Sequence, residues 1–150
     1  MHEFPHHYSV AASANPDGEV ALESDRLPPL ASAPPAEFDG PGDRWSPETL
    51  LAAAVADCFI LTFRSIARAS KLSWISLRCE VVGTLDRIDR VTQFTSFHVR
   101  ASLRVPAGGN GEQARRLMER AEQACLVTNS LKGTVHLEAE VEVAGVPQDR

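Results

Sequence analysis

The 150-residue sequence has no excess of basic residues and no long apolar run. Its 15 Lys and Arg against 20 Asp and Glu give a formal net charge of −5. A protein that binds nucleic acid or an anionic membrane surface normally has a basic excess. The longest uncharged apolar run, Leu50 to Ala56, is far shorter than the roughly 20 residues that cross a bilayer. These absences predict that neither nucleic acid nor a membrane is a partner.

Cysteine is also scarce, with three residues in the chain. Three are too few for the disulfide framework of a small secreted protein, and an odd number leaves at least one thiol free. The segment Met1–His7 lacks the basic region and the following apolar region of a secretory signal. We therefore expect a cytoplasmic protein, in which a cysteine pair that oxidises is more often catalytic or redox-sensing than structural.

The length favours one domain over residues 1–150, with frayed ends at 1–7 and 145–150. Alternating apolar residues and capping signals predict an α+β fold of order ββ–α–ββ–α–β, in which two central helices are covered by antiparallel sheets. The start of the first helix is marked by Ser46-Pro47-Glu48: a hydroxyl cap, a proline at the first helical position and an acid in the first turn. The expected elements are a hairpin (8–24), a loop with five of the ten prolines (27–45), a helix (46–70), two paired strands (74–86 and 91–105), a second helix (112–129) and a last strand after Gly133.

Two of the cysteines, Cys58 and Cys125, fall on the apolar stripes of the two predicted helices, so their sulfurs could meet in a common core. Inert packing is the alternative, because free cysteine is often buried as a small hydrophobic residue and a reactive thiol needs an electropositive, partly exposed setting. Cys79 lies in an alternating strand and is expected to be structural. No CxxC or HxxxH spacing supports a metal site that includes Cys58 and Cys125, so no metal site is expected.

The residues around both cysteines resemble the signature of the OsmC/Ohr family. The first part is the Ser46-Pro47-Glu48 helix start, followed by an alanine-rich turn and by Cys58-Phe59 ten residues after the glutamate. The second part is Cys125 near the end of the other helix, in the segment 121–130. Because the order of elements also matches, the resemblance covers roughly residues 8–145.

The resemblance implies roles for three residues. Cys58 would be the peroxidatic cysteine, Cys125 the resolving cysteine, and Glu48 the residue that holds an arginine against the thiolate. It also implies an intertwined homodimer with active sites at the interface. The better-known members reduce organic hydroperoxides, so we expect a small organic hydroperoxide as substrate. We expect no bound cofactor, and an external dithiol, such as a dihydrolipoyl protein, as the electron donor.

This chemistry requires an activated thiol and a pocket. A thiol with a pKa of about 8.5 is only a few per cent thiolate at pH 7, and a neighbouring cation would raise that fraction. Cys125 would condense with a Cys58 sulfenic acid and so prevent its further oxidation. Apolar walls would favour alkyl or fatty hydroperoxides over hydrogen peroxide. The walls we expect are Leu51, Val55, Phe59 and Phe63.

The activating arginine is the least defined part of the predicted site. The hairpin 8–24 contains no arginine, which leaves Arg26 and Arg44 as candidates. We prefer Arg44 because it lies two residues before the helix cap, although a solvated loop charge is the alternative. Glu48 itself cannot touch Cys58, because ten helical residues separate them by about 15 Å. A bridging arginine or the partner subunit's Glu48 is therefore needed, which independently favours a dimer.

The acidic residue Asp57 directly precedes Cys58 in the sequence. If the Asp57 carboxylate lies close to Cys58, it would raise the pKa of that thiol and oppose activation.

A non-catalytic OsmC-like binding or stress protein, which uses the pocket for a small apolar ligand, is the main alternative function. A thiol-dependent hydrolase is disfavoured, because no histidine is placed to act as its base.

Overall fold

The computed structural model describes residues 1–145. It divides into two compact units, Met1–Leu50 and the part from Leu51 onward, which we describe in turn. Residues 1–10 contain no helix or strand. Of the expected frayed C-terminal end, 145–150, all but Gly145 lies outside the described residues. The single domain stays a prediction.

The first unit is a three-stranded antiparallel sheet in the order β1 (Ala11–Ser13), β2 (Val20–Glu23) and β3 (Leu30–Ser32). The predicted hairpin corresponds to β1 and β2, and Gly18 takes the left-handed conformation (φ +96°) that its turn requires. The third strand is a correction, because β3 and the short helix η1 (Ala36–Phe38) lie in the segment expected to be a loop. Three residues between two proline pairs are too few for an alternation signal, yet enough to pair with β2.

The first helix, α1, covers Pro47–Ala69, as the sequence predicts. Its start is held by two reciprocal hydrogen bonds. The Thr49 backbone N–H donates to Ser46 Oγ (3.1 Å), and the Ser46 backbone N–H donates to Thr49 Oγ1 (2.9 Å). These bonds satisfy groups that a helix end leaves unpaired, so α1 begins at a defined residue.

The second unit contains a three-stranded sheet in the order β4 (Ser76–Ile88), β5 (Val91–Val105) and β6 (Thr134–Val143). β4 and β5 are antiparallel, but β6 runs parallel to β5, so the prediction of purely antiparallel sheets is wrong. The cause is the connection: α2 (Gly111–Ala124) returns the chain to the end of the sheet at which β5 began. A strand that follows such a crossover enters parallel to the previous one.

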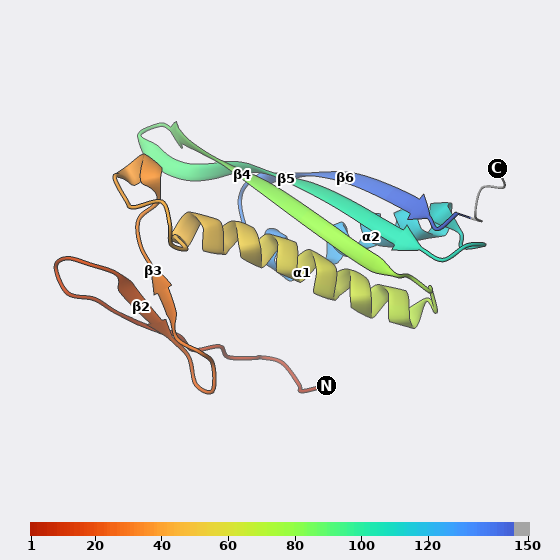
Figure 1. Cartoon of the computed structure of the whole chain (residues 1–150), viewed down its shortest axis with the longest axis horizontal. Coiled ribbons are helices and arrows are strands. Elements are labelled where there is room, and N and C mark those ends of the chain that lie inside the picture. The colour runs from red at the N-terminus through yellow and green to blue at the C-terminus, as the bar shows by residue number, and fades with distance from the viewer. Residues whose placement is uncertain (146–150) are drawn as a thin grey trace. The chain divides into compact units, whose positions relative to one another are not determined.

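α1 and α2 lie under the same face of this sheet (Figure 1). Alternate side chains of β5 point into the core between the sheet and the helices and are buried. The fold is therefore α+β with two helices, as predicted. The helix residues buried in this core are Val55, Phe59, Phe63 and Ala67 of α1, and Ala114, Leu117, Met118 and Ala121 of α2.

The second helix is interrupted at Cys125, whereas the sequence predicts one helix over 112–129. α2 ends at Ala124, Cys125 is extended (ψ 109°), and a short helix, α3, covers Leu126–Asn129. The break is stabilised because the Cys125 carbonyl accepts hydrogen bonds from the Asn129 backbone N–H (3.0 Å) and the Thr128 hydroxyl (3.2 Å). Cys125 thus lies at a corner of the chain.

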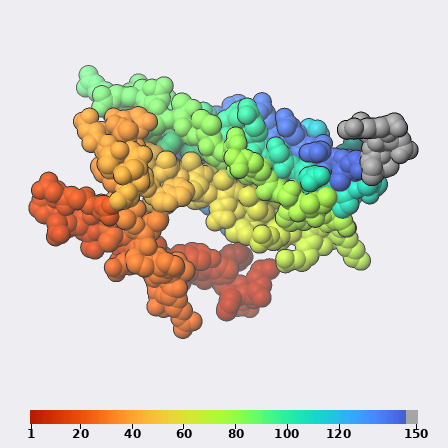
Figure 2. All heavy atoms as spheres, in the orientation of Figure 1, coloured from red at the N-terminus to blue at the C-terminus, as the bar shows by residue number. Residues whose placement is uncertain are grey.

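Much of α1 is not covered within this chain. Of its most apolar stretch 22% is buried, Leu61 is half exposed, and atoms of this helix lie at the surface (Figure 2). Among the described helices α1 is long and apolar enough to cross a membrane. The same composition suits the central helix of a folded core, and the burial of its Phe59–Phe63 face against the sheet favours this second interpretation. The absence of a membrane partner stays a prediction.

Candidate active site

The structure brings the Cys58 and Cys125 thiols together. Cys58 is half-buried on α1, next to the face of that helix that enters the core. Cys125 is 1% exposed at the corner between α2 and α3. The two thiols are near enough for each to shift the pKa of the other. A third group, the Thr62 hydroxyl, lies 3.8 Å from the Cys58 sulfur.

The environment of Cys58 favours its thiolate. Burial alone would raise the pKa of Cys58, but hydrogen bonds to the sulfur outweigh it and leave that pKa below the ordinary value. In order of effect, the donors are the backbone N–H of Val127, the thiol of Cys125, the hydroxyl of Thr62 and the backbone N–H of Leu126. The corner at Cys125 turns the two backbone N–H groups toward Cys58, so this break in the helix is part of the site.

The environment of Cys125 has the opposite effect. Burial raises the pKa of the Cys125 thiol, and the neighbouring Cys58 raises it further, although donors from Thr128 partly offset both effects. The pair is therefore asymmetric: Cys58 is the thiol that ionises more readily, and Cys125 is the thiol that ionises less readily. Only the thiolate is a strong nucleophile. This asymmetry matches the order of action that the family resemblance implies.

Cys79 differs from both. It lies on the inward face of β4, and burial, together with the nearby Cys125 and Glu80, raises its pKa to about 11. A thiol with that pKa is protonated at neutral pH and is a poor nucleophile. This placement fits the structural role predicted for it.

A hollow of about 500 Å³ lies beside Cys58. It does not have the walls predicted from the sequence. Val55, Phe59 and Phe63 are 2% exposed or less and pack in the core, with Leu51 partly buried against them. The physical reason is the helical period: residues four apart share one face, and the row of Ala54, Cys58 and Thr62 is rotated by about 100° from the row of Val55, Phe59 and Phe63. The residues that line the hollow are Ala54, Asp57, Cys58, Leu61, Thr62 and Ser65 of α1, and Leu126 and Val127 of α3.

The first turn of α1 carries an unsatisfied carboxylate. The Glu48 Oε2 atom is buried and has no hydrogen-bond partner within residues 1–145. A buried carboxylate oxygen without a partner is costly, so the site is suited to a donor. An arginine, as the family resemblance implies, would satisfy it.

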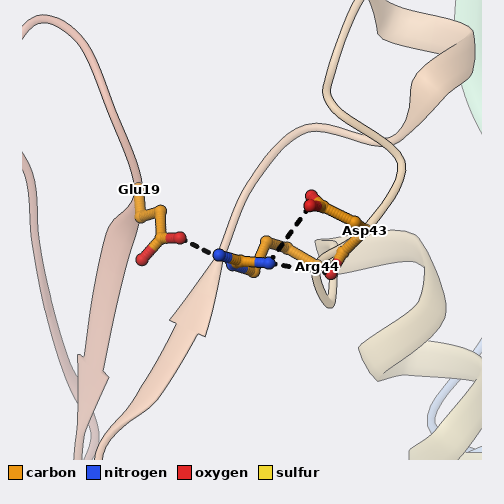
Figure 3. Close-up of polar contacts among 3 residues, drawn as sticks. All are labelled: Glu19, Asp43 and Arg44. Atoms are coloured by element: carbon orange, nitrogen blue, oxygen red, sulfur yellow. Dashed lines mark hydrogen bonds and ion pairs between the residues drawn. The ribbon is translucent and has the colours of Figure 1, made fainter.

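Neither candidate arginine is paired with Glu48. The Arg44 Nε atom donates to Glu19 Oε1 (2.6 Å), and its Nη1 atom lies 3.3 Å from Asp43 Oδ2 (Figure 3). The hydrogen bond that Arg44 donates to Glu19 and the charges of both acids raise the pKa of Arg44. Arg26 is almost fully exposed, with Asp25 at 3.9 Å. The arginine that activates Cys58 stays a prediction.

Three contributors to the site were not assigned from the sequence. Thr62 could have been found, because it follows Cys58 by one turn on the predicted stripe. The N–H groups of Leu126 and Val127 could not, because a continuous helix would have used both groups internally. Within the described residues, no group of three or more His, Cys, Asp or Glu side chains could hold a metal ion.

The α+β fold thus places a lowered-pKa thiol on one helix beside a buried thiol at the end of another. Comparison with known proteins identifies the family to which this fold belongs. Residues 40–140 match the family described as OsmC-like protein, and the chain belongs to this family.

Its relatives include proteins without an assigned function and proteins named for hydroperoxide resistance. The uncharacterized protein YmaD of Bacillus subtilis (strain 168) is 27% identical over 143 residues, which cover 92% of this chain and 95% of the relative. An OsmC-like protein of unknown function from Vibrio cholerae has a similar fold, with a TM-score of 0.83, 18% identity, and 90% and 99% of the two chains covered. An organic hydroperoxide resistance protein, OsmC, from Legionella pneumophila is 26% identical, with a TM-score of 0.73 and coverage of 94% and 100%.

Proposed function

We propose that this protein is a thiol-dependent peroxidase that reduces organic hydroperoxides to alcohols. The observation that carries the proposal is the asymmetric thiol pair, in which the Cys58 pKa is lowered and the Cys125 pKa is raised. The similarity to a hydroperoxide resistance protein supports the choice of substrate. The largely apolar hollow beside Cys58 supports it further, because alkyl groups gain from apolar walls and hydrogen peroxide does not.

The first step is a nucleophilic displacement on oxygen. The Cys58 thiolate attacks the terminal oxygen of the hydroperoxide, and the O–O bond breaks. The bonding electrons leave with the alkoxide, which takes a proton from the solvent to become the alcohol. The sulfur is oxidised to a sulfenic acid that carries the terminal oxygen and its hydrogen.

The second step forms a disulfide. The Cys125 sulfur attacks the Cys58 sulfur, the S–O bond breaks, and the hydroxide leaves as water with the Cys125 proton. An external dithiol, of the kind a dihydrolipoyl protein carries, then reduces the disulfide by two thiol exchanges and becomes a disulfide itself. Because Cys125 is buried next to Cys58, the sulfenic acid is resolved before a second peroxide arrives.

We also propose that this protein forms a homodimer. α1 leaves much of its apolar surface uncovered within one chain, which a second copy would bury. The unpartnered oxygen of Glu48 supports the arrival of an arginine, from Arg44 or Arg26 of either subunit. We place this reaction in the cytoplasm, where a dithiol donor is kept reduced.

The test is intact-mass measurement after one equivalent of cumene hydroperoxide is added to reduced protein. We expect wild type to lose about 2 Da, as the disulfide forms, and Cys125→Ser to gain about 16 Da, as the sulfenic acid persists. A Cys58→Ser variant should do neither, and Cys79→Ser should behave as wild type. Peroxide consumption by Cys58→Ser would overturn the assignment of the nucleophile.

A non-catalytic binding protein is the second candidate. The observation that favours it is the absence, within residues 1–145, of any cation among the groups that shift the Cys58 pKa, together with the engagement of Arg44 by Glu19 and Asp43. On this alternative the hollow holds a small apolar ligand. Unchanged mass, with both thiols still titratable, would support it.

A further inference from the structure

Asp57 lines the same hollow as Cys58. The two residues are neighbours on α1, and six further residues line the hollow with them. None of the other six carries a formal charge: four are apolar (Ala54, Leu61, Leu126 and Val127) and two have hydroxyl groups (Thr62 and Ser65). Among the residues that line the hollow, Asp57 is therefore the one that carries a formal charge besides the thiolate.

That charge is not compensated. Within residues 1–145 the Asp57 side chain makes no ion pair and accepts no hydrogen bond, and it is exposed. A carboxylate that has neither partner keeps its field in the hollow that it lines. A ligand that binds in the hollow beside Cys58 experiences this field as well as the apolar walls.

We propose that Asp57 is a specificity-determining residue that makes the Cys58 site select neutral organic hydroperoxides over those with a carboxylate near the peroxide group. The proposal rests on the proposed function, since it names the class of hydroperoxide that the same thiol takes. Two like unit charges at about 6 Å, under the partial screening found near a protein surface, repel enough to change a rate by roughly tenfold. The effect falls with added salt.

The decisive experiment uses two alkylating probes and needs no peroxidase activity. Iodoacetamide is neutral and iodoacetate is anionic, and both react with the same Cys58 thiolate. The ratio of their rates at Cys58, followed by peptide mass in reduced protein, is therefore independent of the Cys58 pKa. In Asp57→Asn we expect the iodoacetate rate to rise about tenfold relative to iodoacetamide at low salt, and the rise to shrink at high salt.

The matched control is Asp86→Asn, which removes the same charge from the end of β4, away from the hollow. Its ratio should equal that of wild type. An unchanged ratio in Asp57→Asn, or an equal rise in both variants, would overturn the proposal. Asp57→Ala keeps the test sound if the asparagine variant folds poorly.

A second measurement separates this proposal from the proposed function. The ratio of kcat/KM for cumene hydroperoxide to that for its ring-carboxylated analogue should fall about tenfold in Asp57→Asn. If wild type consumes neither peroxide, the peroxidase proposal fails, whereas the alkylation ratio still decides whether Asp57 excludes anions. If both peroxides are consumed and the ratio does not change, Asp57 does not set specificity.

Discussion

The Thr62 hydroxyl lies 3.8 Å from the sulfur of Cys58, one helical turn further along α1. A hydrogen bond to the charged form of a group stabilises that form, so this contact lowers the pKa of Cys58. It comes from the same helix as the sulfur. The activation of Cys58 by Thr62 therefore depends only on α1 being helical from 58 to 62.

We expect Thr62→Val to raise the pKa of Cys58. A hydrogen bond to a charged group contributes about 1.5–3 kcal/mol. Because this contact is long and Cys58 is half-buried, we expect the lower end of that range or less, so alkylation of Cys58 by iodoacetamide at pH 7 should slow by up to roughly tenfold. Ser65→Ala is the control, because Ser65 lines the same hollow without a hydrogen bond to the sulfur. Equal rates in wild type and Thr62→Val would show that the hydroxyl does not act on the thiolate.

The three cysteines should titrate in separate pH ranges. Because hydrogen bonds lower the pKa of Cys58, its alkylation should reach half its maximum at a pH below the ordinary value for a cysteine thiol. Cys125 should become reactive above that value, and Cys79 only near pH 11. Peptide mass after short iodoacetamide pulses across this range measures all three. A Cys58 midpoint above that of Cys125 would contradict the assignment of the nucleophile.

Most of the fold follows from short-range signals in the sequence. The cap at Ser46 and the apolar stripe that follows it predict α1, and the alternation around Phe97 and Leu103 predicts β5. The direction of β6 does not follow from such signals, because a strand has the same alternation whether its neighbour is parallel or antiparallel. The direction of β6 is set by α2, which returns the chain to the end of the sheet at which β5 began.

Part of the candidate site also follows from the sequence, and part of it does not. The meeting of Cys58 with Cys125 follows from two apolar stripes that face one core. The walls of the hollow do not follow, because an apolar residue such as Phe63 fits a pocket and a core equally well in the sequence. The helix break at Cys125 also lacks a local signal, since neither proline nor glycine marks it and its hydrogen bonds come from later residues.

The raised pKa of Cys79 should make the protein less stable in alkaline solution. The unfolded chain releases this proton near pH 8.5, whereas the folded chain holds it until about pH 11. Stability from this group is thus fully present below pH 8.5 and is lost as the pH rises to about 11. In Cys79→Val the urea midpoint should fall less between these pH values than in wild type. Parallel curves for the two proteins would refute this linkage.

Removal of the Ser46 cap should weaken the start of α1. Ser46 is buried, and its side chain and backbone exchange hydrogen bonds with Thr49. Loss of such a cap costs about 1 kcal/mol. We expect Ser46→Ala to lower the free energy of unfolding by this amount in urea titrations. Ser102→Ala, an exposed position on β5, should change it by less than about 0.5 kcal/mol.

Substitution of Phe63 should reduce stability, whereas substitution of Leu61 should reduce the affinity for substrate. Phe63 is fully buried and packs edge to face on Trp74, so Phe63→Ala should lower the free energy of unfolding by about 3–5 kcal/mol. Leu61 is 49% exposed and lines the hollow, so Leu61→Ala should cost little stability. On the proposed function, Leu61→Ala should instead raise the KM for cumene hydroperoxide several-fold, because the substrate loses an apolar contact. Urea titration and peroxide kinetics on both variants test the pair. The opposite pattern, with Leu61 needed for folding and Phe63 for substrate affinity, would show that the substrate binds at the Phe59–Phe63 face of α1, as the sequence predicts.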